Sequence, residues 1–178
     1  MRYPVRRPNR LRNYDYSQPG YYFITICTGG RKPILAKIVG NDALVVPSTI
    51  GVKVVECWKK IERLNDSFKL DTFCLMPNHL HGILIIEKKE AVDGTAGAQC
   101  PTGAARDNTD QKTISDVIKD FKSVTTRHYN KMLPETKNTL WQKSFYEHVI
   151  RNEPSLFEVR KYIEENPLKW QLDQYYSE

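Results

Sequence analysis

Two histidines separated by a single residue are the strongest chemical signal in the sequence. His79 and His81 begin an apolar run that extends to Ile86, and this run is typical of a buried β-strand. Because side chains alternate between the faces of a strand, both imidazoles point to one face, with Cα atoms roughly 6.5 Å apart. Pro77 precedes the pair and indicates a strand edge or turn, where a ligand can approach. The pair predicts a divalent cation site, although buried structural histidines produce the same pattern.

A cation site of this kind has open positions for oxygen ligands and therefore suits phosphate chemistry. The cation would act as a Lewis acid on a phosphodiester, which is attacked either by a metal-bound water or by a hydroxyl side chain. The residues alone do not select among the ten tyrosines of the chain. Tyr162 has one distinguishing feature, since the amide of Asn166 lies one helical turn away and could reach the same metal. The alternative is that Tyr162 fills a half-buried helix position.

Positive charge is concentrated in two parts of the chain. The formal net charge is +6 over 178 residues, and the N-terminal arm, residues 1–13, contains no acidic side chain. This arm either lies on phosphates while nearby tyrosines stack on bases, or is a solvated tail. The second group lies on the polar face of a helix expected after residue 113, which is either solvated surface or the wall of a phosphate-binding groove. The candidate DNA contacts are Arg6, Arg7, Arg10, Arg12, Lys119, Lys122 and Arg127.

The composition favours one domain that is not embedded in a membrane. A hydrophobic content of 40% is enough for a real core, but 178 residues are too few for two comfortable domains. No apolar stretch approaches the roughly 18 residues of a membrane span, and no signal peptide is evident, so we expect a cytoplasmic protein with no membrane partner. The scattered cysteines suit reduced thiols, and we assign no chemistry to Cys27, Cys57, Cys74 and Cys100.

The elements that position these residues follow from periodicity and capping signals. Aromatic and β-branched runs predict strands at residues 21–28, 68–76 and 79–87, with a small strand at 43–46. Apolar residues at helical spacing predict three helices, the first capped by Ser48 or Thr49, the second opened by a capping box at Thr113 and Asp116, and the last capped by Asn152 or Glu153 and closed at Asn166. Residues 141–150 fit either a short strand or an extended connection.

This order of elements predicts an α+β fold. The strands at 68–76 and 79–87 are joined tightly and should pair as an antiparallel hairpin. Residues 91–111 have few large apolar side chains and are expected to form a mobile loop. We therefore expect a single domain over residues 1–178, with an antiparallel sheet covered by helices in a ferredoxin-like split βαβ arrangement.

Three motifs in fixed order resemble the IS200-like tyrosine transposases, and most closely their REP-associated branch. The first is the His-x-His segment at residues 76–82, the second combines Trp141-Gln142 with residues 145–151, and the third is Tyr162-Ile163-x-x-Asn166-Pro167. The resemblance covers residues 14 to 170. It implies that His79 and His81 bind Mg²⁺ or Mn²⁺, that Asn166 completes the metal site, and that Tyr162 is the nucleophile.

The resemblance also implies the reaction and its substrate. The protein would be a metal-dependent single-stranded DNA endonuclease and strand transferase, a transposase that acts on hairpin DNA through a covalent 5′-phosphotyrosine intermediate, as a monomer or a homodimer. A phenol with a pKa of about 10 needs a neighbouring cation for such an attack. Two alternatives remain open. One is a structured-nucleic-acid binding protein of the same fold without catalysis, and the other is a metal-dependent phosphodiester hydrolase that uses an activated water.

Overall fold

A four-stranded antiparallel sheet forms the centre of the computed structural model, which describes residues 14–87, 112–134 and 139–176. Its strands, in the spatial order β4-β5-β1-β6, are β4 (Phe68–Leu75), β5 (His79–Ile86), β1 (Gly20–Cys27) and β6 (Tyr146–Ile150). All three pairings are antiparallel. β1 lies between two partners, in keeping with its β-branched and aromatic composition.

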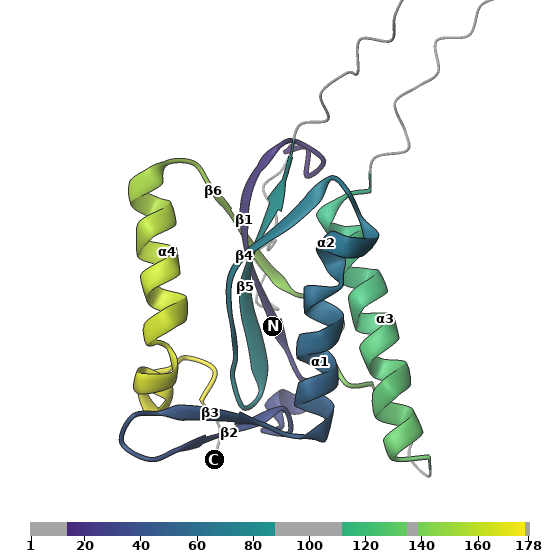
Figure 1. Cartoon of the computed structure of the whole chain (residues 1–178), viewed down its shortest axis with the longest axis vertical. Coiled ribbons are helices and arrows are strands. Elements are labelled where there is room, and N and C mark those ends of the chain that lie inside the picture. The colour runs from purple at the N-terminus through teal and green to yellow at the C-terminus, as the bar shows by residue number, and fades with distance from the viewer. Residues whose placement is uncertain (1–13, 88–111, 135–138, 177–178) are drawn as a thin grey trace, which may run out of the picture.

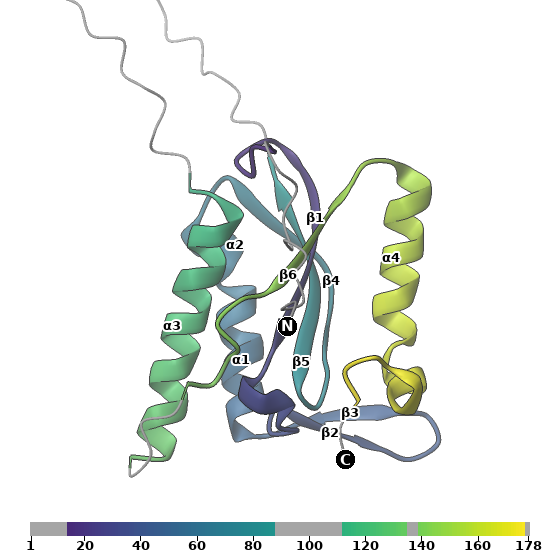
Figure 2. The same ribbon diagram turned by 180° about the vertical axis from the view of Figure 1, so that it is seen from behind.

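Helices cover both faces of the sheet (Figures 1 and 2). One face carries α1 (Thr49–Lys59), α2 (Ile61–Leu64) and α3 (Ile114–Met132). The opposite face carries α4 (Glu153–Glu165), which continues into the 3₁₀ helix η2 (Pro167–Leu172). The order of strands and helices confirms the predicted α+β fold with a split βαβ arrangement.

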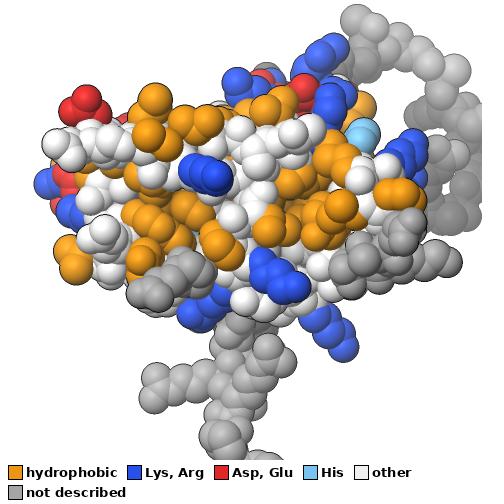
Figure 3. All heavy atoms as spheres, turned by 90° about the horizontal axis from the view of Figure 1, so that it is seen from below, with side chains coloured by type: hydrophobic (Ala, Val, Ile, Leu, Met, Phe, Trp, Pro, Cys, Tyr) orange, Lys and Arg blue, Asp and Glu red, His pale blue; other side chains and the backbone are white. Residues whose placement is uncertain are grey.

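A small two-stranded sheet lies beside η2 at one end of the molecule (Figure 1). Figure 3 shows the molecule from this end, where many hydrophobic side chains and a few Lys and Arg side chains lie at the surface. It consists of β2 (Ala36–Val39) and β3 (Leu44–Pro47), and the short 3₁₀ helix η1 (Gly29–Arg31) connects β1 to it. The expected strand at 43–46 corresponds to β3, whereas β2 and η2 were not predicted.

Alternation along the strands divides the buried side chains into two clusters. Tyr22, Ile24 and Ile26 of β1 join the large cluster on the side of α1 and α3. Phe23, between them in sequence, faces α4 and belongs to the second cluster. The members of this α4 cluster are Phe23, Ile83, Ile150, Leu156 and Ile163.

Gly82, next to the histidine pair, allows β5 to approach α1. A Cβ atom at this position would lie 2.6 Å from Cζ2 of Trp58 and 3.1 Å from Cβ of Phe73. Distances this short leave no room for a methyl group, so a glycine is needed where the indole crosses the sheet. The strand can therefore present His81 to one face while its other face is in close contact with α1.

The capping predictions are confirmed at all three helices. The Ser48 hydroxyl accepts a hydrogen bond from the Gly51 amide, Thr113 and Asp116 form the reciprocal capping box, and Asn152 caps α4. The uncertain segment at 141–150 is resolved into β6 and a single bridge between Trp141 and Thr28. The N-terminal arm and the loop expected at 91–111 lie outside the described residues. In the described parts, no helix has both the length and the apolar character needed to cross a membrane.

Candidate active site

The two histidines are fully buried on the face of the sheet that carries α4. Cys27 and Thr25 of β1 stand opposite His79 and His81 in the strand register, and both imidazoles are inaccessible to solvent. The Nε2 atoms of the two rings lie 2.8 Å apart. The predicted strand therefore brings both rings to one point, as two ligands of one cation require.

Hydrogen bonds from neighbouring residues fix how each ring is oriented. Asn78 donates from Nδ2 to the carbonyl oxygens of Arg31 and Tyr175, so its Oδ1 is left to accept from Nδ1 of His79 at 2.7 Å. Because Nδ1 carries the proton, Nε2 of the neutral His79 ring is unprotonated and has a free lone pair. Nδ1 of His81 contacts Oγ1 of Thr25 at 2.8 Å. Outer partners of this kind orient metal-binding histidines and set their tautomer.

The protonation state of the pair suits metal binding. Burial lowers the pKa of His79, and burial together with the proximity of His79 lowers the pKa of His81 well below its usual value. Both rings are therefore neutral at neutral pH. The neutral imidazole is the form that donates a lone pair to a metal.

Tyr162 reaches this pair from α4 of the same chain. Its hydroxyl oxygen lies 3.3 Å from Nε2 of His81, and its ring stands edge-on to Phe23 at a centroid distance of 6.0 Å. Burial raises the pKa of Tyr162, so the free phenol is protonated at neutral pH. The structure thus brings together the tyrosine and the two histidines singled out in the sequence.

Asn166 is also at the site, and it brings with it a carboxylate that the sequence did not suggest. Its side chain is 2% exposed, and Nδ2 donates to Oδ2 of Asp173 at 2.6 Å. Oδ1 of Asn166 is buried and has no hydrogen-bond partner among the described residues. Asp173 directly follows η2, in a segment without a recognisable motif. Its position at the site therefore became evident only from the three-dimensional structure.

The donor set fits a divalent cation. His79, His81 and Asp173 each offer a ligand atom, and these atoms lie within 4.8 Å of one another. The buried amide oxygen of Asn166 adds a further neutral donor without a partner among the described residues. Two imidazole nitrogens combined with carboxylate and amide oxygens form a mixed donor set of the kind that divalent metal ions accept.

The C-terminal segment covers the histidine pair. The ring of Tyr175 lies 4.9 Å from that of His79, and Trp170 lies 5.9 Å from the same ring. The Arg31 guanidinium stacks over Tyr175 at 5.3 Å. A cavity of 290 Å³ opens at Tyr162, and it is lined by Tyr162, Asn166, Lys169, Leu172, Asp173 and Gln174.

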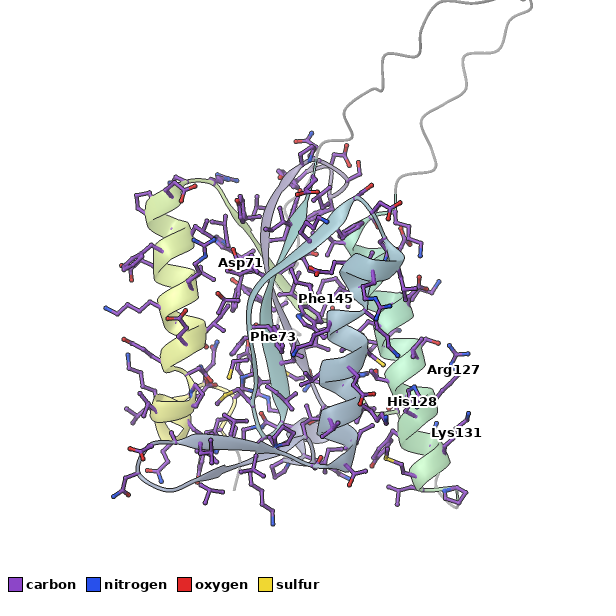
Figure 4. All side chains as sticks on the ribbon, viewed as in Figure 1. Asp71, Phe73, Arg127, His128, Lys131 and Phe145 are labelled. Atoms are coloured by element: carbon purple, nitrogen blue, oxygen red, sulfur yellow. The ribbon has the colours of Figure 1, made fainter. Side chains whose placement is uncertain are left out.

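The basic residues predicted on α3 lie on the other side of the sheet from Tyr162. Lys119 and Arg127 are exposed, and Arg127 projects outward from α3 (Figure 4). Lys122 differs from them, because its Nζ donates to the backbone carbonyls of residues 142, 143 and 144 at 2.6, 3.1 and 3.3 Å. The structure does not bring these three residues to the histidine pair, and the four arginines of the arm lie outside the described residues.

Replacing Lys122 with methionine should lower stability rather than weaken DNA binding. The change leaves three carbonyl oxygens without their charged donor, at a cost of about 1–2 kcal/mol. Thermal unfolding should show a decrease in Tm of several degrees. Lys119→Met, on the same helix, should unfold like the wild type. Unchanged unfolding of Lys122→Met with weaker binding to hairpin DNA would instead make Lys122 a DNA contact.

A family model and a related protein match this sequence. A family model described as IS200-like transposase matches residues 107–166, a range that includes Tyr162 and Asn166. An uncharacterized protein of Haemophilus influenzae is 34% identical over 173 residues, covering 96% of this chain and 93% of the relative.

Two solved structures are also similar. A REP-associated tyrosine transposase bound to a REP hairpin has a TM-score of 0.59 at 20% identity, covering 90% of this chain and 73% of that chain. A putative transposase from Deinococcus radiodurans has a TM-score of 0.45 at 20% identity, covering 88% of this chain and 95% of that chain. The first of these shares the fold, and the family match contains the residues that carry the tyrosine motif. The chain belongs to the IS200-like transposase family.

Proposed function

We propose that this transposase is a metal-dependent endonuclease and strand transferase for single-stranded DNA that forms a covalent 5′-phosphotyrosine intermediate. One observation supports this most strongly. The Tyr162 hydroxyl lies 3.3 Å from Nε2 of His81, within a group of side chains able to hold a cation. A site that only activates water does not require a tyrosine hydroxyl at this position, whereas nucleophilic attack by tyrosine does.

The residues of the chain would divide the work as follows. His79, His81, Asp173 and Asn166 would hold the cation, which when bound supplies a Lewis acid for a phosphate oxygen. The Tyr162 oxygen attacks phosphorus, an O–P bond forms, and the bond from phosphorus to the 3′ oxygen breaks. The tyrosine hydroxyl donates to Oδ2 of Asp173 at 3.4 Å, which orients it, and the phenolic proton passes to solvent water. The departing 3′ oxygen gains a proton from solvent.

The intermediate explains how one site can both cut and join. The phosphotyrosine ester retains the energy of the phosphodiester, so attack by a 3′-hydroxyl can restore a DNA strand without ATP. The Phe23 and His81 rings hold the tyrosine ring in place, with the His81 ring 5.2 Å away. This restraint reduces the entropic cost of bringing the tyrosine oxygen to the phosphorus atom.

We propose that the substrate is a DNA hairpin with single-stranded flanks and that the chain is of the REP-associated branch. The support is the shared fold of the transposase bound to a REP hairpin, together with the order of the three motifs. Lys119, Arg127 and the four arginines of the N-terminal arm are the proposed contacts to the DNA backbone. Because one chain supplies both Tyr162 and the histidines, a monomer suffices for cleavage, and a homodimer would contain two such sites.

The test is to incubate the protein and Mn²⁺ with a hairpin oligonucleotide labelled at its 3′ end, with flanks copied from a palindrome beside the encoding gene. Attack by tyrosine attaches protein to the labelled fragment, which then migrates as a protein–DNA adduct on a denaturing gel. A labelled fragment without protein would indicate hydrolysis by water. Binding without any cleavage would indicate a structured-nucleic-acid binding protein. Either result would overturn the proposal.

A further inference from the structure

The helix that carries Tyr162 is attached to the sheet by few apolar contacts. The α4 cluster has five buried members, of which α4 contributes Leu156 and Ile163. Figures 1 and 2 show α4 as the helix on its face of the sheet, opposite the pair formed by α1 and α3. These apolar side chains set which face of α4 points to the sheet, but they restrain small rotations of the helix less than a directional hydrogen bond does.

A directional contact is present two residues before the tyrosine. The Arg160 guanidinium donates from Nε to both carboxylate oxygens of Asp71, at 3.1 and 3.2 Å, and its Nη2 donates to Oδ2. The Asp71 side chain is 12% exposed and that of Arg160 is 41% exposed. A planar guanidinium in this geometry restrains both the distance and the orientation of its partner.

Asp71 lies at a bulge in β4, on the face of the sheet that carries α4. The register shifts between Leu70 and Phe73, which pair with Leu84 and Gly82 respectively. Leu70 and Phe73 both contact the large cluster on the side of α1, so β4 holds one extra residue between them compared with β5. Alternation from Leu70 turns Asp71 toward α4, and the extra residue returns Phe73 to the side of α1. Figure 4 shows Asp71 toward α4 and Phe73 toward α1. The amide and hydroxyl of Thr72 donate to Asp71 at 2.6 and 3.1 Å, which fixes the carboxylate on the sheet.

Arg160 and Tyr162 flank the buried stripe of α4. At about 100° per residue, the two side chains leave the helix roughly 200° apart, with Leu156 and Ile163 between them on the sheet side. The arginine holds one edge of the helix to β4, while the tyrosine hydroxyl meets His81 at the other edge. A rotation of α4 that broke the ion pair would therefore move the hydroxyl relative to the histidines.

We infer that Asp71 and Arg160 form a positioning pair that sets the rotation of α4 and thereby holds the Tyr162 hydroxyl at the histidine pair. This inference rests on the proposed role of Tyr162 as the nucleophile. Neither residue touches the reacting atoms. Their effect is on the geometry of attack, where a misplacement of about 1 Å costs on the order of 100-fold in rate.

The experiment measures adduct formation and hairpin binding for Arg160→Gln and Asp71→Asn with the 3′-labelled hairpin oligonucleotide and Mn²⁺. We expect the rate of adduct formation to fall about 10- to 100-fold at saturating DNA, with the dissociation constant for the hairpin within about twofold of the wild type. Arg160→Lys retains the charge and one donor, so it should recover part of the rate. Lys161→Gln removes the same charge from an exposed neighbour and should react at the wild-type rate.

Two results would overturn the inference. One is an unchanged rate in both variants. The other is a loss of rate and hairpin binding together with a large fall in Tm, because the pair would then only stabilise the fold. The proposed function fails separately, if Tyr162→Phe still forms the adduct. If Tyr162→Phe forms no adduct while Arg160→Gln and Asp71→Asn react at the wild-type rate, the inference about the positioning pair fails and the proposed function stands.

Discussion

Replacing Tyr162 with phenylalanine should abolish the covalent adduct while leaving hairpin binding nearly intact. The change removes one oxygen atom, which in the structure contacts His81 at 3.3 Å and Asp173 at 3.4 Å. The phenylalanine ring can keep the edge-on contacts with Phe23 and His81, so the helix should remain seated. Loss of a nucleophile that acts together with its partners should lower the rate about 10⁴-fold or more. Denaturing gels of the labelled oligonucleotide measure this loss.

Tyr146→Phe is the matched control for this experiment. Tyr146 also lies near Phe23, with ring centroids 6.2 Å apart, and is 43% exposed. Its hydroxyl is not among the atoms that gather at the histidine pair in the described residues. We expect this variant to form the adduct at the wild-type rate. Should Tyr162→Phe form the adduct and Tyr146→Phe not, the nucleophile would be Tyr146.

Removal of His81 should have the second largest effect, and it should act through the metal. His81→Ala deletes one of two imidazoles and leaves Nε2 of His79 without its neighbour at 2.8 Å. We expect Mn²⁺ affinity and the rate of adduct formation both to fall by more than about 100-fold, which exceeds the usual effect of losing an outer partner. Calorimetric titration with Mn²⁺ alone measures the affinity without relying on activity.

Thr25→Val provides a graded comparison. The variant keeps the volume of a buried side chain but removes the hydroxyl that contacts Nδ1 of His81 at 2.8 Å. Outer partners of metal-binding histidines contribute about 10- to 100-fold in affinity, so the loss should be smaller than that of His81→Ala. His128→Ala, on α3 across the sheet, should bind Mn²⁺ like the wild type. Equal Mn²⁺ affinity in all four proteins would mean that the pair is structural.

The strand pattern and the capping signals were sufficient to predict most of the fold. Alternation placed His79 and His81 on one face, and the hairpin between β4 and β5 followed from the tight connection between them. β2 escaped prediction because Ala36–Val39 is short and mixed in character, with Lys37 between two apolar residues. Short edge elements are stabilised by their tertiary partner rather than by their own sequence.

The site was predictable only where its residues share one element. The histidines lie on one strand, and Tyr162 and Asn166 lie one helical turn apart. Asp173 reaches the site because the chain turns back through η2, a path that no local pattern encodes. Asp71 and Phe73 face opposite sides of the sheet because of a bulge between them, whereas regular alternation would have given them the same face. The carbonyl partners of Lys122 could not be predicted, because they come from a segment about 20 residues away in sequence.

The unequal size of the two apolar clusters has a consequence for motion. Among the residues that the structure describes, 21 buried side chains form the cluster on the side of α1 and α3, whereas five form the cluster on the opposite face. Partial opening takes the least secured element first, so backbone amides of α4 should exchange with deuterium sooner than those of α1. Folding stability and chemistry therefore reside on different layers of the molecule. Local opening of α4 can occur while the sheet, α1 and α3 stay folded, which would let a polynucleotide enter and leave the site without global unfolding.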